Sequence, residues 1–312
     1  MSYEAKHFSV LLKECIENLN IKPDGIYLDG TLGLGGHSYE IASRLTSGRL
    51  VGIDRDETAI ERAGKRLAPF GEKVTLVHGN FSDAAAILDR LGIQGVDGML
   101  FDLGVSSPQL DEVQRGFSYM ADAPLDMRMD EADSLSAYEV VNHWDEEKLN
   151  RILWDYGEER YARRISRAII QHREKKPIET TLELVDIIKG AMPAAALREK
   201  QHPAKRSFQA IRIAVNDELG AISAMMDTAP DKLNKGGRLC VISFHSLEDR
   251  IIKAGIAARE NGCTCPREAP ICTCGFVQTL RSVSRKPILP SPEELELNPR
   301  SRSAKLRVAE RV

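Results

Sequence analysis

Apolar and polar positions alternate between two spacings along the first hundred residues. Short apolar runs are interleaved with segments whose apolar side chains recur at helical spacing. The runs predict buried strands at 26–29, 49–54, 73–80 and 96–103, and the helical segments are 8–20, 37–45, 57–67 and 84–91. Strict alternation of strand and helix predicts an α/β fold, in which a parallel sheet carries helices on both faces.

This alternation stops after the fourth strand. The next buried run, "GRLCVISF", begins only at Gly237, although a crossover with one helix needs about 30 residues. Helical patterns fill the interval at 136–141, 145–157, 160–174 and 181–192. We therefore predict an all-helical domain, 110–205, inserted into a main domain formed by 1–109 and 206–312. One long helix, about 205–228, would lead back, and segments 276–288 and 304–312 would form a closing hairpin.

Composition narrows the class of protein. The 312 residues are 42% hydrophobic and 29% charged, as in globular proteins, and charges interrupt every apolar run well short of membrane length. The N-terminus lacks the basic start and apolar stretch of a signal peptide, so we expect a cytoplasmic protein without membrane association. A net charge of −3 argues against chain-wide attraction to nucleic acid, so any such binding needs local basic patches.

The sequence "YLDGTLGLGGH" at 27–37 places Gly33, Gly35 and Gly36 between the first strand and its helix. Glycines allow a sharp turn and close approach of a ligand, and the helix amides point the same way, which is typical of a nucleotide-like cofactor site. Asp29 ends the strand. A carboxylate there would repel a pyrophosphate, whereas it suits the ammonium and sulfonium of S-adenosylmethionine. Alternatively, or in addition, Asp29 caps the amides of the turn.

Acidic residues also end the second and fourth strands. Asp54 lies at about the distance from the glycines at which a carboxylate binds ribose hydroxyls, although it could instead cap the next helix. Asp102 ends the fourth strand and would face the same edge of the sheet. Phe81, after the third strand, either covers an adenine or belongs to the core. The loop after Asp102 supplies hydroxyls and the amide of Gln109, which could orient a planar group.

Matches to a known family extend along nearly the whole chain, in order. The sequence resembles the bacterial family that uses S-adenosylmethionine to methylate the exocyclic N4 of a cytidine in the decoding region of small-subunit (16S) ribosomal RNA. The matching stretches are "DGTLGLGGHS", "GIDRD", "FDLGVSSPQLD", "RGFSY", "PLDMRM", "YGEER", "FQAIRIAVNDEL", "ISFHSLEDR" and "NPRSRSAKLRVAER". The resemblance implies a class I, Rossmann-like methyltransferase fold with an inserted helical domain, and 16S rRNA in the small subunit as partner.

The resemblance also implies the site residues. Around the cofactor it places Gly35, Gly36 and His37 at the methionine end, Asp54 at the ribose, Phe81 by the adenine, and Asp102 and Gln109 completing the pocket. Thr31 stands where the general methyltransferase loop has its first glycine. Asp102 is the candidate catalytic residue, either orienting the cytosine amine or only lining the pocket. Methyl transfer needs no metal, so we expect no catalytic metal.

The basic candidates for RNA contact are 161–176 in the insertion and 298–307 near the C-terminus, and we favour the second because its charges are denser. His245 and Glu248 could contact RNA or simply cap a helix. Four of the six cysteines, Cys263, Cys265, Cys272 and Cys274, fall in one short segment. In a reducing compartment they would be thiols or metal ligands, although zinc sites usually space paired cysteines more widely.

Other interpretations stay open at this point. A nicotinamide-dependent dehydrogenase would share the sheet, but Asp29 opposes its pyrophosphate. An RNA-binding ribosome-assembly factor with a vestigial cofactor pocket would not need Asp54 and Asp102. A DNA amino-methyltransferase usually has Pro-Pro-aromatic after the fourth-strand acid, where this chain has "DLGVSSP". The sequence does not determine the oligomeric state.

Overall fold

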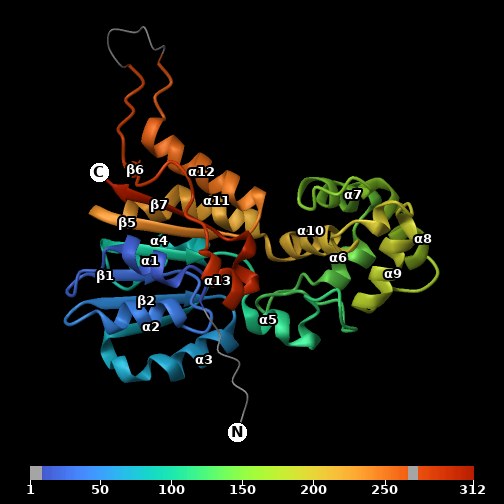
Figure 1. The fold of residues 1–312 in the computed structure, drawn as a ribbon, viewed down its shortest axis with the longest axis horizontal. Coiled ribbons are helices and arrows are strands. Elements are labelled where there is room, and N and C mark those ends of the chain that lie inside the picture. Colours follow the sequence, from blue (N-terminus) through green and yellow to red (C-terminus); the bar gives the residue numbers. More distant parts are fainter. Residues whose placement is uncertain (1–8, 266–272) are drawn as a thin grey trace. The chain divides into compact units, whose positions relative to one another are not determined.

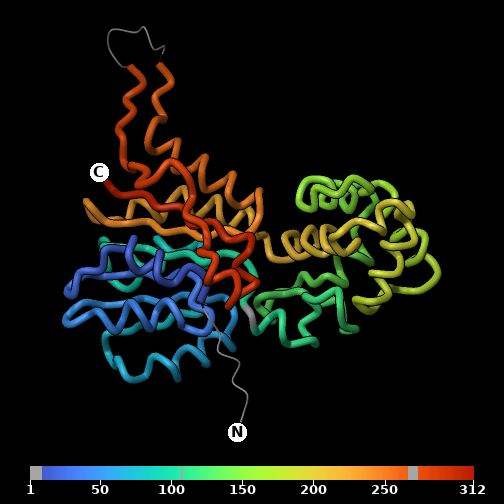
Figure 2. The backbone as a smooth tube through the Cα atoms, in the orientation of Figure 1, coloured from blue at the N-terminus to red at the C-terminus, as the bar shows by residue number. Residues whose placement is uncertain are grey.

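The computed structural model describes residues 9–265 and 273–312, which form two compact units (Figure 1). Unit 1 comprises the chain through Gly104 and again from Leu219, and unit 2 is Val105–Glu218. Figure 2 follows the backbone out of unit 1 after the fourth strand and back into it later. None of the helices in these two ranges is long and apolar enough to cross a membrane.

Unit 1 is built on a seven-stranded sheet in the order β3-β2-β1-β4-β5-β7-β6. The strands are β1 (Ile26–Asp29), β2 (Arg49–Asp54), β3 (Val74–His78), β4 (Val96–Asp102), β5 (Leu233–Ser243), β6 (Leu280–Ser282) and β7 (Lys305–Arg311). The first five in this order are parallel neighbours, and β7 runs antiparallel to both β5 and β6. The predicted α/β sheet is confirmed, and the predicted closing hairpin corresponds to β6 and β7.

Helices cover both faces of this sheet. Alternate strand side chains point to opposite faces, so the apolar side chains on each face are buried by helices. The helices of unit 1 are α1 (Leu12–Leu19), α2 (Gly36–Ser43), α3 (Glu57–Leu67), α4 (Ala84–Arg90), α11 (Glu218–Thr228), α12 (Ser246–Asn261) and α13 (Pro292–Leu297). Tyr27 and Leu100 belong to a core cluster with residues of α1 and α2. Leu28 and Phe101, their neighbours in sequence, belong to a second cluster with residues of α4, α11 and α12.

Unit 2 is helical. It contains α5 (Ser107–Asp111), α6 (Ala137–His143), α7 (Glu146–Asp155), α8 (Ala162–Arg173), α9 (Thr181–Ala191) and α10 (Lys205–Asn216). Several of these helices begin at side-chain caps that the sequence supplies, including Ser136 before α6, Asp145 before α7 and a Thr180–Glu183 capping box at α9. Apolar faces of α6 to α10 share one core cluster.

The prediction of one long helix over about 205–228 is wrong. Two helices, α10 and α11, are separated at Asp217, whose φ of 47° lies in the left-handed region and ends α10. Phe208 and Ile211 of α10 pack into the core of unit 2. For this reason α10 belongs to unit 2, and the units divide after Gly104 and Glu218, whereas the predicted boundaries follow residues 109 and 205.

Candidate active site

The carboxyl ends of β1, β2 and β4 meet at one edge of the sheet, since these strands are parallel neighbours. Asp29 at the end of β1 is paired in register with Gly52 of β2 and Leu100 of β4. Asp54 and Asp102 are the last residues of β2 and β4. Three carboxylates that the sequence singled out are thus brought to the same edge, where ligands of open α/β sheets bind.

Asp29 is buried and fully engaged. Its Oδ1 accepts a hydrogen bond from the Thr31 amide at 3.2 Å, and its Oδ2 accepts one from the Ser38 hydroxyl at 2.7 Å. Burial raises the pKa of this carboxyl to about 6, although both hydrogen bonds act to lower it. The alternative that Asp29 caps the amides of its own turn is therefore confirmed.

The glycine turn leads directly into α2. Gly33 and Gly35 adopt φ of 51° and 72°, a backbone conformation that is strained in residues other than glycine. Gly35 is also the N-cap of α2. Gly36 is the first residue of that helix, and a Cβ there would lie 1.8 Å from the Ser9 hydroxyl oxygen. The His37 ring, also in the first turn, is buried and lies with Nε2 3.0 Å from the Val10 carbonyl oxygen. A neutral ring donating from Nε2 has its acceptor at Nδ1.

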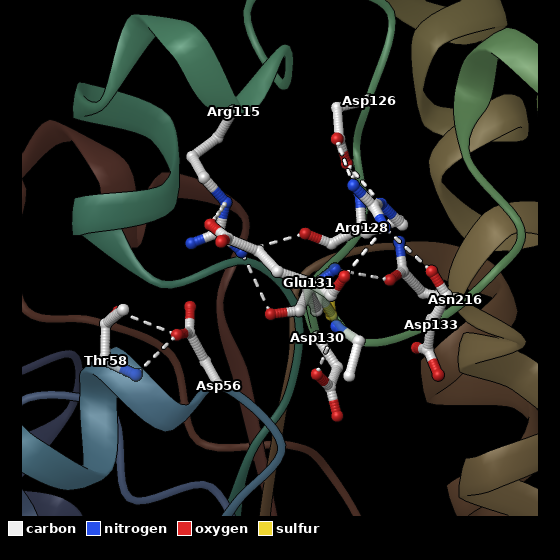
Figure 3. Close-up of polar contacts among 11 residues, drawn as sticks. Asp56, Thr58, Arg115, Asp126, Arg128, Asp130, Glu131, Asp133 and Asn216 are labelled. Carbon is white, nitrogen blue, oxygen red and sulfur yellow. Dashed lines mark hydrogen bonds and ion pairs between the residues drawn. The ribbon is translucent and has the colours of Figure 1, made fainter.

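Asp54 connects the second strand to the glycine turn. Its Oδ2 accepts a hydrogen bond from the Gly33 amide at 2.7 Å, and its Oδ1 accepts one from the Asp56 amide at 2.9 Å. Burial raises the pKa of Asp54 despite these two hydrogen bonds. The neighbouring Asp56, rather than Asp54, caps α3 by accepting from the Thr58 amide, as Figure 3 shows.

Asp102 is the least satisfied carboxylate of the three. Its Oδ1 is buried and has no hydrogen-bond partner among the described residues, while its Oδ2 lies 4.0 Å from His37 Nδ1. Burial, reinforced by repulsion from Asp29, Glu248 and Glu294, raises the pKa of Asp102 well above the ordinary value. Its backbone amide donates to the Thr31 hydroxyl oxygen at 2.5 Å. Thr31 therefore connects the glycine turn to β4. This role requires the threonine hydroxyl, so a glycine could not perform it.

Two other predicted cofactor residues, Phe81 and Gln109, have structural partners of their own. Phe81 is partly buried and meets the Phe101 ring edge-on at a centroid distance of 6.0 Å, so it contributes to the core. Gln109 belongs to unit 2, where its Oε1 accepts from the Ser106 amide at 3.0 Å and forms a capping box at α5. Whether either residue contacts a cofactor stays a prediction.

Other candidates have structural partners. His245 and Glu248 form the capping box at the start of α12, as one of the two alternatives expected. In the C-terminal basic segment, Arg307 donates to both carboxylate oxygens of Asp249, and Lys305 lies 3.6 Å from the same carboxylate. Asp249 therefore neutralises part of the positive charge for which this segment was favoured.

Sequence reasoning missed a polar cluster in unit 2 (Figure 3). The Arg115 guanidinium donates to the carbonyl oxygens of Arg128 and Met129. The Asn216 side chain accepts from the Met129 amide and donates to the Met127 carbonyl oxygen, both at 2.8 Å. Three of the matching stretches, "RGFSY", "PLDMRM" and "FQAIRIAVNDEL", are thus joined, and their polar residues were the available signal.

Known proteins resemble this chain over its whole length. The MraW methylase family matches residues 4–312. A ribosomal RNA small subunit methyltransferase H of Brevibacillus brevis is 58% identical over 307 residues, which are 98% of either chain. A protein of the same name from Clostridioides difficile is 54% identical over 310 residues, covering 99% of this chain and 100% of its own. Another, from a Paenibacillus species, is 55% identical over 314 residues, covering 98% and 99%.

Proposed function

Because this chain belongs to the MraW methylase family, we propose that it methylates the exocyclic N4 of a cytidine in the decoding region of 16S ribosomal RNA. S-adenosylmethionine is the cofactor, and it supplies a methyl group activated by a positively charged sulfur. We further propose that the substrate is the RNA within the small ribosomal subunit, and that the enzyme acts in the cytoplasm. The names of the relatives support a ribosomal RNA substrate.

The carboxyl edge of the sheet in unit 1 fits a cationic cofactor. Repulsion from Asp29 helps to raise the pKa of Asp102, so a positive charge bound at this edge would be stabilised. The single observation that carries the proposal is Asp102 Oδ1, a buried acceptor with no hydrogen-bond partner in the described ranges. An ammonium or sulfonium would satisfy such an edge, whereas the pyrophosphate of a nicotinamide cofactor would add to the repulsion.

We assign roles to the other residues of this edge by their contacts. Gly33, Gly35 and Gly36 would place backbone amides and the start of α2 against the methionine end, with His37 beside them. Asp54 already holds the Gly33 amide, and the remaining lone pairs of its oxygens would accept from ribose hydroxyls. Asp29 is buried and engaged, so it would act through its charge rather than by direct contact.

Asp102 would accept a hydrogen bond from the cytosine amine and hold its lone pair in line with the methyl carbon. S-adenosylmethionine would supply the methyl carbon to N4 and leave as S-adenosylhomocysteine, and the methylated amine would release one proton to solvent. No strong base is needed before attack, because the methylated cation is acidic. Holding the two groups in line can lower the barrier by roughly 7–11 kcal/mol at best.

We propose that unit 2 recognises the RNA. Between α8 and α9 lies a cavity of about 730 Å³. Its lining includes four cationic side chains and two acidic ones, namely Arg164, Arg167, Lys175, Lys176, Glu183 and Asp186. Because single-stranded RNA is bound through phosphates and through bases placed in pockets, a cavity lined by more basic than acidic side chains suits it. A vestigial assembly factor is a weaker interpretation, because the strand-end carboxylates are present.

The test is incubation of the protein with labelled S-adenosylmethionine and small ribosomal subunits that lack their native modification. We expect label on N4 of one cytidine of the decoding region, located by nuclease digestion and mass spectrometry. Protein-free 16S RNA, tested in parallel, shows whether the assembled subunit is required. Label on another nucleotide, or on no RNA at all, would contradict the proposal.

A further inference from the structure

Three cysteine sulfurs gather away from the sheet edge, on an arm of unit 1. The arm is formed by 262–265, which follows α12, and by 273–279, which leads into β6 (Figure 1). The Sγ atoms of Cys263, Cys265 and Cys274 all lie within 4.8 Å of one another. The fourth cysteine of the sequence pattern, Cys272, lies outside the described residues.

We propose that Cys263, Cys265 and Cys274 bind a zinc ion that joins the two segments of this arm. Zinc–sulfur bonds of about 2.3 Å at tetrahedral angles place two ligand sulfurs about 3.8 Å apart. The Cys263 and Cys274 sulfurs are 3.6 Å apart, close to that separation. A disulfide would need sulfurs about 2.05 Å apart, so this geometry suits a shared ion better.

A backbone amide also contacts the cluster. The Thr273 amide donates a hydrogen bond to Cys265 Sγ at 3.3 Å. Amide hydrogen bonds to sulfur are typical of the shell around metal-bound cysteines.

The base of the arm already holds its two segments together. The Thr279 amide donates to the Arg259 carbonyl oxygen at 3.0 Å. A Cβ at Gly262 would lie 2.8 Å from the Phe276 ring, so only glycine allows this approach. Since the ligands come from both segments, the close Cys-x-Cys spacing along the chain does not prevent a site. Soft thiolate ligands select zinc over magnesium or calcium, and the ion would be structural, apart from methyl transfer.

The first experiment measures metal content. The full chain is expressed with zinc, purified in a phosphine reductant and analysed by plasma mass spectrometry. We expect about one zinc per chain in the wild type, and at least a tenfold loss in the Cys263→Ser/Cys274→Ser double variant. Thr264→Ala, on the same arm, is the matched control and should keep its zinc. Zinc retained by the double variant would overturn the proposal.

A second experiment needs no variant. Cobalt added to metal-free wild-type protein should give the near-ultraviolet thiolate-to-cobalt band and the strong visible bands of a tetrahedral site. The absence of these bands would also overturn the proposal. So would a Cys263–Cys274 disulfide that persists in the presence of the reductant. Both readouts omit RNA and S-adenosylmethionine, so a failure here is distinct from a failure of the proposed methyl transfer.

Discussion

Two carboxylates at the ends of β2 and β4 have opposite local circumstances. Asp54 accepts two backbone amides, so its removal would leave donors unpaired. Asp102 has an oxygen without a hydrogen-bond partner in the described chain, and its ionisation is opposed by burial and by other carboxylates. The first residue therefore fixes the conformation of the glycine turn, whereas we expect the second, when ionised, to destabilise the fold.

Asp102→Asn should separate activity from stability. We expect methyl transfer to fall roughly 10²-fold or more, because the amide cannot supply the negative charge at the reacting amine. The thermal midpoint of the cofactor-free protein should stay equal or rise, since an ionisable buried group is removed. Asp97→Asn, at the other end of β4, is the control. It makes the same carboxyl-to-amide change at a side chain that is hydrogen-bonded, since Asp97 Oδ2 accepts from the Ile26 amide. A drop in midpoint for Asp102→Asn with unchanged transfer would contradict this prediction.

Asp54→Ala should weaken binding of S-adenosylmethionine, measured by calorimetry, by tenfold or more, because the Gly33 amide loses its acceptor and the ribose loses its own. Asp56→Ala is the matched control. It removes the cap of α3, at a stability loss of about 1 kcal/mol, but leaves the Gly33 contact in place. Equal affinities for the two variants would show that the ribose lies elsewhere.

At the scale of elements, the turn between β1 and α2 depends on a side chain that no motif count would favour. The Thr31 hydroxyl accepts from the Asp102 amide, and the Thr31 amide donates to Asp29. The ends of two strands are thereby held at fixed positions around the glycines. The threonine at the position of the usual first glycine therefore adds a contact between two strands, and it does not weaken the motif.

Thr31→Val tests this contact. The valine keeps the shape but leaves the Asp102 amide without its acceptor, at a cost of about 1–3 kcal/mol of unfolding free energy. Thr31→Ser keeps the hydroxyl and should lie within about 0.5 kcal/mol of the wild type. Urea unfolding gives the free energies, and calorimetry shows whether cofactor affinity falls with them. Valine and serine variants of equal stability would rule out the connecting role.

Helix α8 of unit 2 is the element to test for RNA binding. Arg164→Ala/Arg167→Ala, on the cavity side, should weaken binding to small subunits and reduce the salt slope by roughly one for each phosphate that is no longer bound. Affinity for S-adenosylmethionine should not change. Arg163→Ala, which removes an exposed arginine outside the cavity lining of the same helix, is the control. An equally large decrease in affinity for small subunits in the double variant and in Arg163→Ala would reflect net charge rather than the cavity.

The elements that carry periodic signals could be predicted from the sequence, namely the parallel strands, the glycine turn and the helical insertion. The contacts of Asp54 with Gly33, and of Asn216 with the segment around Met129, join residues far apart in sequence, so local pattern contains no trace of them. The break at Asp217 was missed for a similar reason, because apolar spacing continues on both sides of one left-handed residue. The sequence also did not show that Asp29 is buried and hydrogen-bonded to Thr31 and Ser38.

For the molecule as a whole, the acidic edge couples pH to stability and binding. The folded-state pKa of Asp29, about 6, lies above its ordinary value of 3.8. The folded state therefore binds this proton more tightly than the unfolded state. The resulting stabilisation is complete below about pH 4 and is lost as pH rises through about 6, an effect on the order of 3 kcal/mol. A nearby cation would recover part of that loss above pH 6.

The increase in thermal midpoint on adding S-adenosylmethionine should therefore be larger at pH 7.5 than at pH 5.5. Scanning fluorimetry at the two pH values measures it. S-adenosylhomocysteine, which lacks the sulfonium charge, is the ligand control, and Asp29→Asn should reduce the pH dependence. Identical shifts for both ligands at both pH values would show that the strand-end charges do not sense the cofactor.

The division of the chain has a consequence for its synthesis. Unit 2 is one continuous segment, whereas unit 1 needs residues from both sides of it. On the ribosome, β4 emerges before the whole of unit 2, and its neighbour β5 only afterwards. Until then a nascent chain offers an unpaired strand edge while its insertion can already be folded. The time that translation spends on those intervening codons sets how long neighbouring nascent chains can associate through that edge.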